Sequence, residues 1–151
     1  MRVVYRGDMF APALTGRQKV ERLQAEVSKL PQYEPETTHT FHGGMYCRGV
    51  WRPAGVVVIG KVHKKEHFYL IVSGTVQITG GDGPAVEVTG PRLICSKPGT
   101  KRAVYAVTDA LCMTFHVVNA TTVEDAEAEL VEDDPLSMYA IGNKAIVKEI
   151  S

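Results

Sequence analysis

The sequence lacks an excess of either charge. Its 17 lysines and arginines are balanced by 17 aspartates and glutamates, so the formal net charge is zero. Proteins that bind nucleic acids or acidic membranes by electrostatic attraction carry a basic excess or a basic stripe. We therefore expect neither a nucleic acid nor a membrane among the partners of this chain.

Long apolar runs are also missing. No stretch approaches the ~18 consecutive apolar residues that a membrane helix needs. Arg2, Arg6 and Asp8 interrupt any apolar run at the start, which therefore does not resemble an export signal. We expect the chain to be made in, and to fold in, a cytoplasm.

Cysteine is scarce, with three residues at Cys47, Cys95 and Cys112. An odd number without a Cys-x-x-Cys spacing does not indicate a disulfide framework or a zinc ribbon. Because each cysteine lies in an apolar stretch, we expect buried free thiols in a reducing compartment. No pattern suggests a nucleophile with a base and an orienting acid.

Glycine and proline, by contrast, are plentiful, with 14 and 8 residues that separate short β-branched runs. Such punctuation indicates an all-β body, and 151 residues make one domain. We expect a jelly-roll barrel of short strands over residues 41–119. An arm and a helix (1–40) would precede it, and a short helix and a C-terminal tail (120–151) would follow.

The clearest helical pattern runs from Thr15 to Leu30. Thr15 and Gln18 have the spacing of a capping box, and Pro31 ends the pattern. One apolar stripe follows the helical repeat, and it consists of Val20, Leu23, Val27 and Leu30. Either the outer face of a sheet or another subunit must cover this stripe.

The stretch from Gly60 to Gly74 carries the polar residues of greatest interest. Side chains two apart in a strand share a face, so Lys61 and His63 point the same way. A Lys64-Lys65 turn leads into a second strand that places His67 and Tyr69 on one face. The two imidazoles can therefore converge across the turn.

The other face of this second strand holds Phe68, Leu70 and Val72, so the strand is apolar on both sides. The helix stripe, the tail or a second copy of the chain could cover its outer side. If a second copy does, the interface residues would be Val20, Leu23, Val27, Phe68 and Leu70.

The stretch around His63 resembles the first sequence motif of the cupin superfamily. Gly74 matches the closing glycine, His63 the second histidine, and His67 stands in the place of the glutamate. Lys61 takes the place of the first histidine. The second motif would run from Gly90 to Arg102, with Arg102 in the third histidine position. The resemblance covers residues 45–118 and implies a cupin barrel, but only two positions keep a usable metal ligand.

Several stretches also resemble the small cupin-like proteins encoded in tailed-bacteriophage genomes. They are Pro31-Gln32, residues 39–48, residues 61–67, Pro98 to Arg102, and Thr114 to His116. This resemblance implies a phage context. Together with the degraded metal motif and the surplus of apolar side chains, it leads us to expect a virion protein, such as a capsid decoration or a tail-associated subunit. We also expect a homo-oligomer that assembles with other phage structural proteins after synthesis in the host cytoplasm.

His116 is a third candidate ligand, because a catalytic iron, zinc or manganese needs about three nitrogen or oxygen ligands. Two orientations of its strand are open. His116 shares a face with Cys112 and Thr114, whereas Leu111, Met113, Phe115 and Val117 occupy the other face. If the more apolar face is the core face, His116 points outward, and a metal site is not formed.

Lys61 and Arg102 oppose a metal, because cations beside a metal ion repel it. Pointing into the barrel, they would instead favour an anion such as a carboxylate, and Tyr69 could add a hydroxyl donor. The candidate pocket is thus Lys61, His63, His67, Tyr69, Arg102 and His116. We predict a structural virion protein without catalysis and without a cofactor. The alternative is a metal-dependent small-molecule cupin enzyme, or a sugar-binding protein, that uses His63 and His67.

Overall fold

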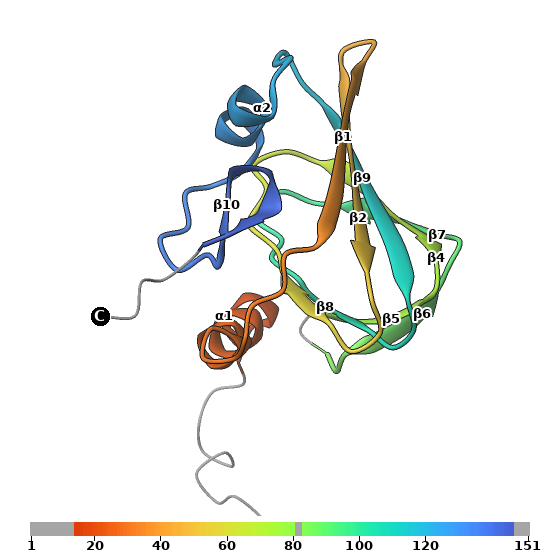
Figure 1. Cartoon of the computed structure of the whole chain (residues 1–151), viewed down its shortest axis with the longest axis vertical. Helices are drawn as coiled ribbons and strands as arrows, with labels where there is room; N and C mark the ends of the chain where they lie inside the picture. Colours follow the sequence, from red (N-terminus) through yellow and green to blue (C-terminus); the bar gives the residue numbers. More distant parts are fainter. Residues whose placement is uncertain (1–13, 81–82, 147–151) are drawn as a thin grey trace, which may run out of the picture.

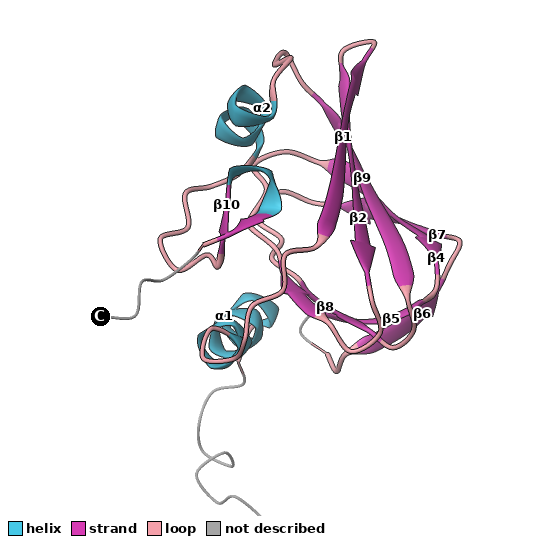
Figure 2. Ribbon diagram, viewed as in Figure 1, coloured by secondary structure: helices cyan, strands magenta, loops and turns pink. Residues whose placement is uncertain are grey.

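The computed structural model describes residues 14–80 and 83–146. Residues 1–13 of the predicted arm, residues 81–82 of a glycine-rich turn, and residues 147–151 of the predicted tail lie outside the described part. Within it, the chain is mostly β and forms two main antiparallel sheets and a minor two-stranded one (Figures 1 and 2).

The larger sheet has five strands, and its order is not the order of the sequence. Across the sheet the strands are β1 (Glu36–His42), β2 (Met45–Arg52), β9 (Ala110–Val117), β4 (His67–Ser73) and β7 (Arg92–Ser96). The smaller sheet consists of β3 (Val57–Ile59), β8 (Ala103–Ala106), β5 (Thr75–Thr79) and β6 (Val86–Thr89). Buried residues of both sheets form one core, so the sheets pack face to face, as in the expected jelly roll.

Strand alternation determines which side chains enter the barrel. In β4 the burial alternates, with His67, Tyr69 and Ile71 buried and the residues between them more exposed. Gly74 ends this strand with φ +85°, a conformation that favours glycine. A Cβ at this position would clash with the carbonyl oxygen of Asp109.

Helix α1 (Gly16–Val27) begins at Thr15 with the capping box that the sequence predicts. Val20 is fully buried against Val58 and Ile59 of the small sheet, and Leu23 and Val27 pack beside it. Leu30 lies beyond the helix and is exposed. Apart from Leu30, the helix stripe is therefore covered within the chain, by the small sheet and not by the large one.

Helix α2 (Val123–Leu130) is capped by Thr122, whose hydroxyl accepts from the backbone N–H of Asp125. Ala126 and Leu130 are buried in a cluster with Tyr46 and Val118. The chain then continues through β10 (Tyr139–Ala140), the 3₁₀ turn η2 (Ile141–Asn143) and β11 (Lys144–Ala145). In Figure 1, α1, β10 and α2 lie along one side of the barrel.

None of the described helices combines the length and the hydropathy that crossing a membrane would require.

Candidate functional site

Three histidines from different parts of the chain meet inside the barrel. His63 precedes β4, His67 begins it, and His116 lies near the end of β9. The ring centroids of His63 and His67 are 4.3 Å apart, and those of His67 and His116 are 4.7 Å apart. His63 and His116 are separated by 5.1 Å. The structure thus brings together the three histidines that the sequence singles out.

His116 reaches this cluster because β9 has the less apolar of its two faces inside. Cys112 and His116 are buried, whereas Val117 is 74% exposed. The interpretation in which the apolar face of β9 forms the core is therefore wrong. The inner face of β9 lies beside the polar side chains of β2 and β4, so a polar inner face is consistent across three strands.

Burial holds the three imidazoles in their neutral form. It lowers the pKa of His63 to about 2, with further lowering by His67, His116, Arg48 and Arg102. Burial likewise lowers the pKa of His116 to about 3. It also lowers the pKa of His67, and Arg102 adds to the effect. At neutral pH the cluster therefore carries no charge of its own and can both donate and accept hydrogen bonds.

The orientation of the rings does not fit a metal ion. A ligand nitrogen binds a metal in the plane of its ring, so three rings must aim at one point about 2.0–2.1 Å from each nitrogen. Here the planes of His63 and His116 differ by only 14° and are stacked, as are those of His67 and His116 at 29°. Within residues 14–80 and 83–146, no three His, Cys, Asp or Glu side chains form a group that could hold a metal. Close ring centroids alone do not make a metal site.

Hydrogen-bond contacts of two of the histidines also argue against a metal site. His116 Nε2 lies 2.9 Å from the hydroxyl of Thr114, and His67 Nδ1 lies 3.3 Å from the carbonyl oxygen of Lys65. One nitrogen of each ring is thus already in contact with a protein group.

A small cavity of about 70 Å³ adjoins the cluster, and its lining is rich in cations. Its ionisable and phenolic lining residues are Arg52, Lys61, His63, His67, Tyr69 and Arg102. Five of the six predicted pocket residues are on this wall or its rim, and His116 stacks behind them. None of the described lining residues is acidic.

Arg52, at the end of β2, is the most unusual of these residues. It is only 4% exposed, and its Nε and Nη1 atoms have no hydrogen-bond partner. Burying an unpaired charge is costly unless something neutralises it. No carboxylate in the described part of the chain forms an ion pair with Arg52.

Tyr69 supplies a second unused donor. Burial raises the pKa of its hydroxyl, so the proton stays on the oxygen although Arg52 lowers the pKa. The Cys112 thiol lies beside this hydroxyl, but a thiol is only a weak hydrogen-bonding group. The Tyr69 hydroxyl has no hydrogen bond within the described part of the chain. It is therefore available to donate to a bound group.

Arg102 stands over the ring of Tyr69, with its guanidinium carbon 5.4 Å from the ring centroid. Its Nη1 donates to the hydroxyl of Ser96 at 2.7 Å. Burial lowers the pKa of this guanidinium, but an arginine remains charged at any ordinary pH. The cavity thus combines two arginines, one lysine and a phenol.

A buried ion pair closes the barrel beside the histidines. Arg48 Nη2 donates to Glu127 of α2 at 2.7 Å, and Arg48 Nε donates to the hydroxyl of Tyr46 at 2.8 Å. The backbone N–H of Gly142 also donates to Glu127, at 3.2 Å. These contacts fasten α2 and the η2 turn to this end of the barrel.

The sequence analysis does not single out Arg48 or Arg52, and an arginine directly before a proline, as Arg52 is before Pro53, is typical of a turn. The signal was the two-residue alternation of β2. It places Tyr46, Arg48, Val50 and Arg52 on one face, and three of these four residues are buried.

The other residues of interest lie elsewhere. Val20, Leu23 and Val27 pack within the chain, whereas Phe68 and Leu70 lie on the outer face of the large sheet. All three cysteines are free, as expected, but only Cys112 is buried, and Cys95 is exposed. The expectation of three buried thiols is therefore wrong.

Solved structures with a similar fold share little sequence with this chain. The lyase DddQ from Ruegeria pomeroyi, which acts on DMSP, is 13% identical with a TM-score of 0.50, over 59% of this chain and 49% of that chain. Several of the similar structures are described as cupin proteins. A cupin superfamily protein from Desulfitobacterium hafniense is 12% identical with a TM-score of 0.46, over 62% of this chain and 87% of that chain. KdgF from a Halomonas species is 13% identical with a TM-score of 0.48, over 56% and 80%.

No family model matches the sequence, and no curated protein matches it either. At these identities the similarity concerns the fold alone. The two packed antiparallel sheets match the barrel that the sequence leads us to expect. The likeness to phage-encoded proteins stays a prediction.

Proposed function

We propose that this chain binds a small molecule through an oxyanion, most simply a carboxylate, inside its barrel. The observation that carries the proposal is the buried Arg52, whose Nε and Nη1 have no partner. A carboxylate accepts charge-assisted hydrogen bonds from a guanidinium, and such bonds are about twice as strong as neutral ones. An anion would therefore neutralise this buried charge and satisfy its free donors.

The surrounding groups suit the same ligand. The hydroxyl of Tyr69 has no partner and Arg102 stands over the ring, so both can act on one bound anion. The neutral histidines add hydrogen-bonding groups without a competing negative charge. Since no carboxylate among the described residues lines the cavity, nothing there repels the ligand.

The size of the cavity limits what can enter. At about 70 Å³ it has room for a group of a few non-hydrogen atoms, because one water takes up about 30 Å³ of the liquid. The ligand is therefore a very small acid, or a larger molecule that inserts only its acidic end. A sugar acid would fit the second description.

A thermal-stability screen tests this proposal. Acetate, succinate, phosphate and sulfate would each be added to the whole protein and to an Arg52→Gln variant. We expect at least one anion to raise the Tm of the wild type and to have little effect on the variant. Arg92→Gln is the matched control, because Arg92 is exposed at the start of β7 and does not line the cavity.

In this screen Arg92→Gln should respond as the wild type does. If no anion stabilises the wild type more than Arg52→Gln, or if Arg92→Gln loses the response equally, anion binding at Arg52 is refuted.

A structural role in a virion is our second candidate function. Two observations support it: the resemblance of several sequence stretches to phage-encoded proteins, and apolar side chains such as Val117 and Phe68 that are exposed on the large sheet. Mass spectrometry of purified particles from the source of this gene tests it. We expect the chain among the particle proteins, and its absence there would remove this candidate. The metal-dependent alternative has less support, because no three His, Cys, Asp or Glu side chains in the described part of the chain form a group that could hold a metal.

A further inference from the structure

The outer face of the large sheet is apolar and uncovered. We call this surface the outer sheet face, and its most exposed members are Met45, Trp51, Phe68, Leu93 and Val117. These five side chains come from β2, β4, β7 and β9. Monomeric proteins rarely expose a contiguous apolar patch of this kind unless something binds to it.

The side chains on this face form rows that cross the sheet. Phe115 pairs with Cys47 of β2 on one side and with Phe68 of β4 on the other, and Phe68 pairs with Cys95 of β7. Directly paired residues have their side chains on the same face. The outward positions of β2, β9, β4 and β7 contain no charged residue.

Polar residues border the face. The edge strand β1 pairs its Thr40 with Cys47 and its Glu36 with Trp51, which continues the rows with polar side chains. Glu66 and Lys97 lie at the opposite border. An apolar centre with a polar rim is the usual anatomy of a protein–protein interface.

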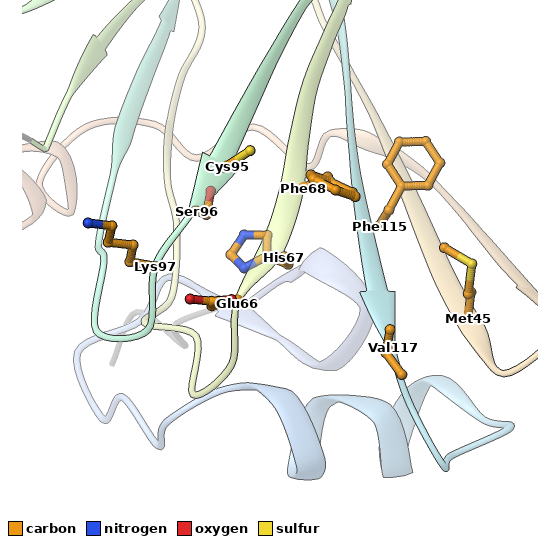
Figure 3. A pocket seen from close by; sticks show the side chains of 9 residues that line it. All are labelled: Met45, Glu66, His67, Phe68, Cys95, Ser96, Lys97, Phe115 and Val117. Carbon is orange, nitrogen blue, oxygen red and sulfur yellow. The ribbon is translucent and has the colours of Figure 1, made fainter.

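Two hollows lie at opposite ends of the face. One, of about 310 Å³, is lined by Met45, Phe68 and Phe115, and Figure 3 shows Phe68 and Phe115 on neighbouring strands beside it. The other, of about 270 Å³, is lined by Trp51, Leu111 and Met113. A surface with relief at both ends can be matched by a copy of itself turned by a half rotation.

We propose that a second copy of this chain covers the outer sheet face, so that the protein is a two-fold dimer with its large sheets packed together. In a two-fold dimer the same patch of both subunits meets, and the patch must be self-complementary. An uncharged face meets this condition, because equal charges would otherwise be brought together. The zero net charge of the chain adds no long-range repulsion between copies.

The area of the face suits a dimer. Strands of seven or eight residues, as in β4 and β9, are about 25 Å long at about 3.3 Å per residue. The four strands β2, β9, β4 and β7 lie about 4.8 Å apart and span about 19 Å, which gives a flat area of about 480 Å² per copy. Two such faces together bury close to the ~1,000 Å² that a specific interface needs, and the relief of the side chains adds to this area.

No described segment of the chain competes for this place. Helix α1 is already packed on the small sheet, and Tyr139 of β10 is buried in the same cluster as Val20. The proposed dimer therefore uses Phe68 and Leu70 of the interface expected from the sequence, but not the helix stripe. It does not depend on the proposed anion site, which faces the opposite side of the sheet.

Light scattering on the eluting protein tests the proposal by mass. We expect twice the 16.5 kDa of one chain for the wild type. Val117→Asp and Phe68→Asp place a charge at the centre or border of the interface and should each give a single-chain mass. Val86→Asp is the matched control, because Val86 is an exposed valine of the small sheet and should leave the dimer intact.

A single-chain mass for the wild type at about 100 μM overturns the proposal. A dimer that survives both large-sheet substitutions, or that is lost in Val86→Asp, also overturns it.

Alkylation of Cys95 gives a second measurement that needs no variant. This exposed thiol lies in the row of Phe68 and Phe115. We expect its rate of modification to fall as the protein concentration rises, because the dimer covers it. A rate that does not depend on concentration contradicts a second copy as the occupant, whether the thiol is open or is shielded by the chain itself.

Discussion

Lowering the pH from about 7.5 to about 5.5 is expected to destabilise this protein strongly, because His63, His67 and His116 are held in the neutral form inside the barrel. In the folded state the pKa is about 2 for His63 and about 3 for His116, against an ordinary value of 6.5. A histidine with a lowered folded pKa binds fewer protons when folded than when unfolded. Its contribution to stability is therefore complete above about pH 6.5 and is lost as the pH falls from there towards the folded value.

The size of the effect follows from the unfolded pKa, because both folded values lie far below the pH of the experiment. At about pH 5.5 an unfolded histidine is about 90% protonated, and each buried histidine then costs about 1.4 kcal/mol. His63 and His116 together account for about 2.7 kcal/mol. The pKa of His67 is also lowered by burial and adds in the same direction, as does that of His39.

Urea unfolding followed by the fluorescence of the single tryptophan measures this loss. With an m-value of about 2 kcal/mol/M, the midpoint should fall by about 1.4 M between the two pH values. The half-buried carboxylate of Asp134 does not interfere, because its pKa is lowered from 3.8 and its contribution is lost only at more acidic pH. In His116→Gln the pH-dependent loss should shrink by about 1.4 kcal/mol, the share of one histidine. A midpoint that is the same at both pH values would refute the neutral buried cluster.

Three further predictions concern single residues: two buried cations and one turn glycine. In urea unfolding, the ligand-free Arg52→Met variant should be as stable as the wild type or more stable, because removing an unpaired buried charge is favourable. A marked loss of stability would show that Arg52 has a partner in the protein. Lys101→Met should lower the free energy of unfolding in urea by about 3–5 kcal/mol, because it leaves Asp134 without its 2.8 Å ion pair. A loss below about 1 kcal/mol would mean that the pair is solvated. Gly74→Ala should lower the Tm by several degrees or prevent folding, since φ is +85° and a Cβ would clash there. Gly83→Ala is its control, because a Cβ there meets open space, and equal effects of the two substitutions would contradict the strained turn.

Local patterns in the sequence predicted the parts of the site that depend on neighbouring residues. The two-residue period of β4 places His67 and Tyr69 inside, and the short turn before it brings His63 to the same point. The capping box at Thr15 likewise depends on residues three apart, and the structure has it. These signals are local, so a single sequence contains them.

The orientation of β9 could not be read in this way. Its two faces are Cys112, Thr114 and His116 on one side and Leu111, Met113, Phe115 and Val117 on the other, and apolar content favours the second face as the core. The structure has the opposite arrangement. Strand β9 lies between β2 and β4, whose inner faces carry polar side chains, and the more polar face of β9 lies beside them. The face of a strand depends on what covers it, and a single strand does not carry that information.

Arg52 was missed for a related reason. An arginine before a proline is typical of a turn, and charged residues are rarely buried without a partner. Arg52 is the last residue of β2. Only the alternation along the whole strand, which places Tyr46, Val50 and Arg52 on the inner face, shows that its side chain enters the barrel. Residues that violate the usual rules of burial are often those that bind a ligand, and this makes them hard to predict from composition.

The central claim, that the interior of the barrel is completed by a bound oxyanion, is tested most directly by a crystal structure grown with the anion that stabilises the protein most. We predict electron density for that anion in the cavity, within hydrogen-bond distance of Arg52 Nε and of the Tyr69 hydroxyl. An Arg52 side chain that instead pairs with a carboxylate of the protein, with no anion beside it, would contradict the account.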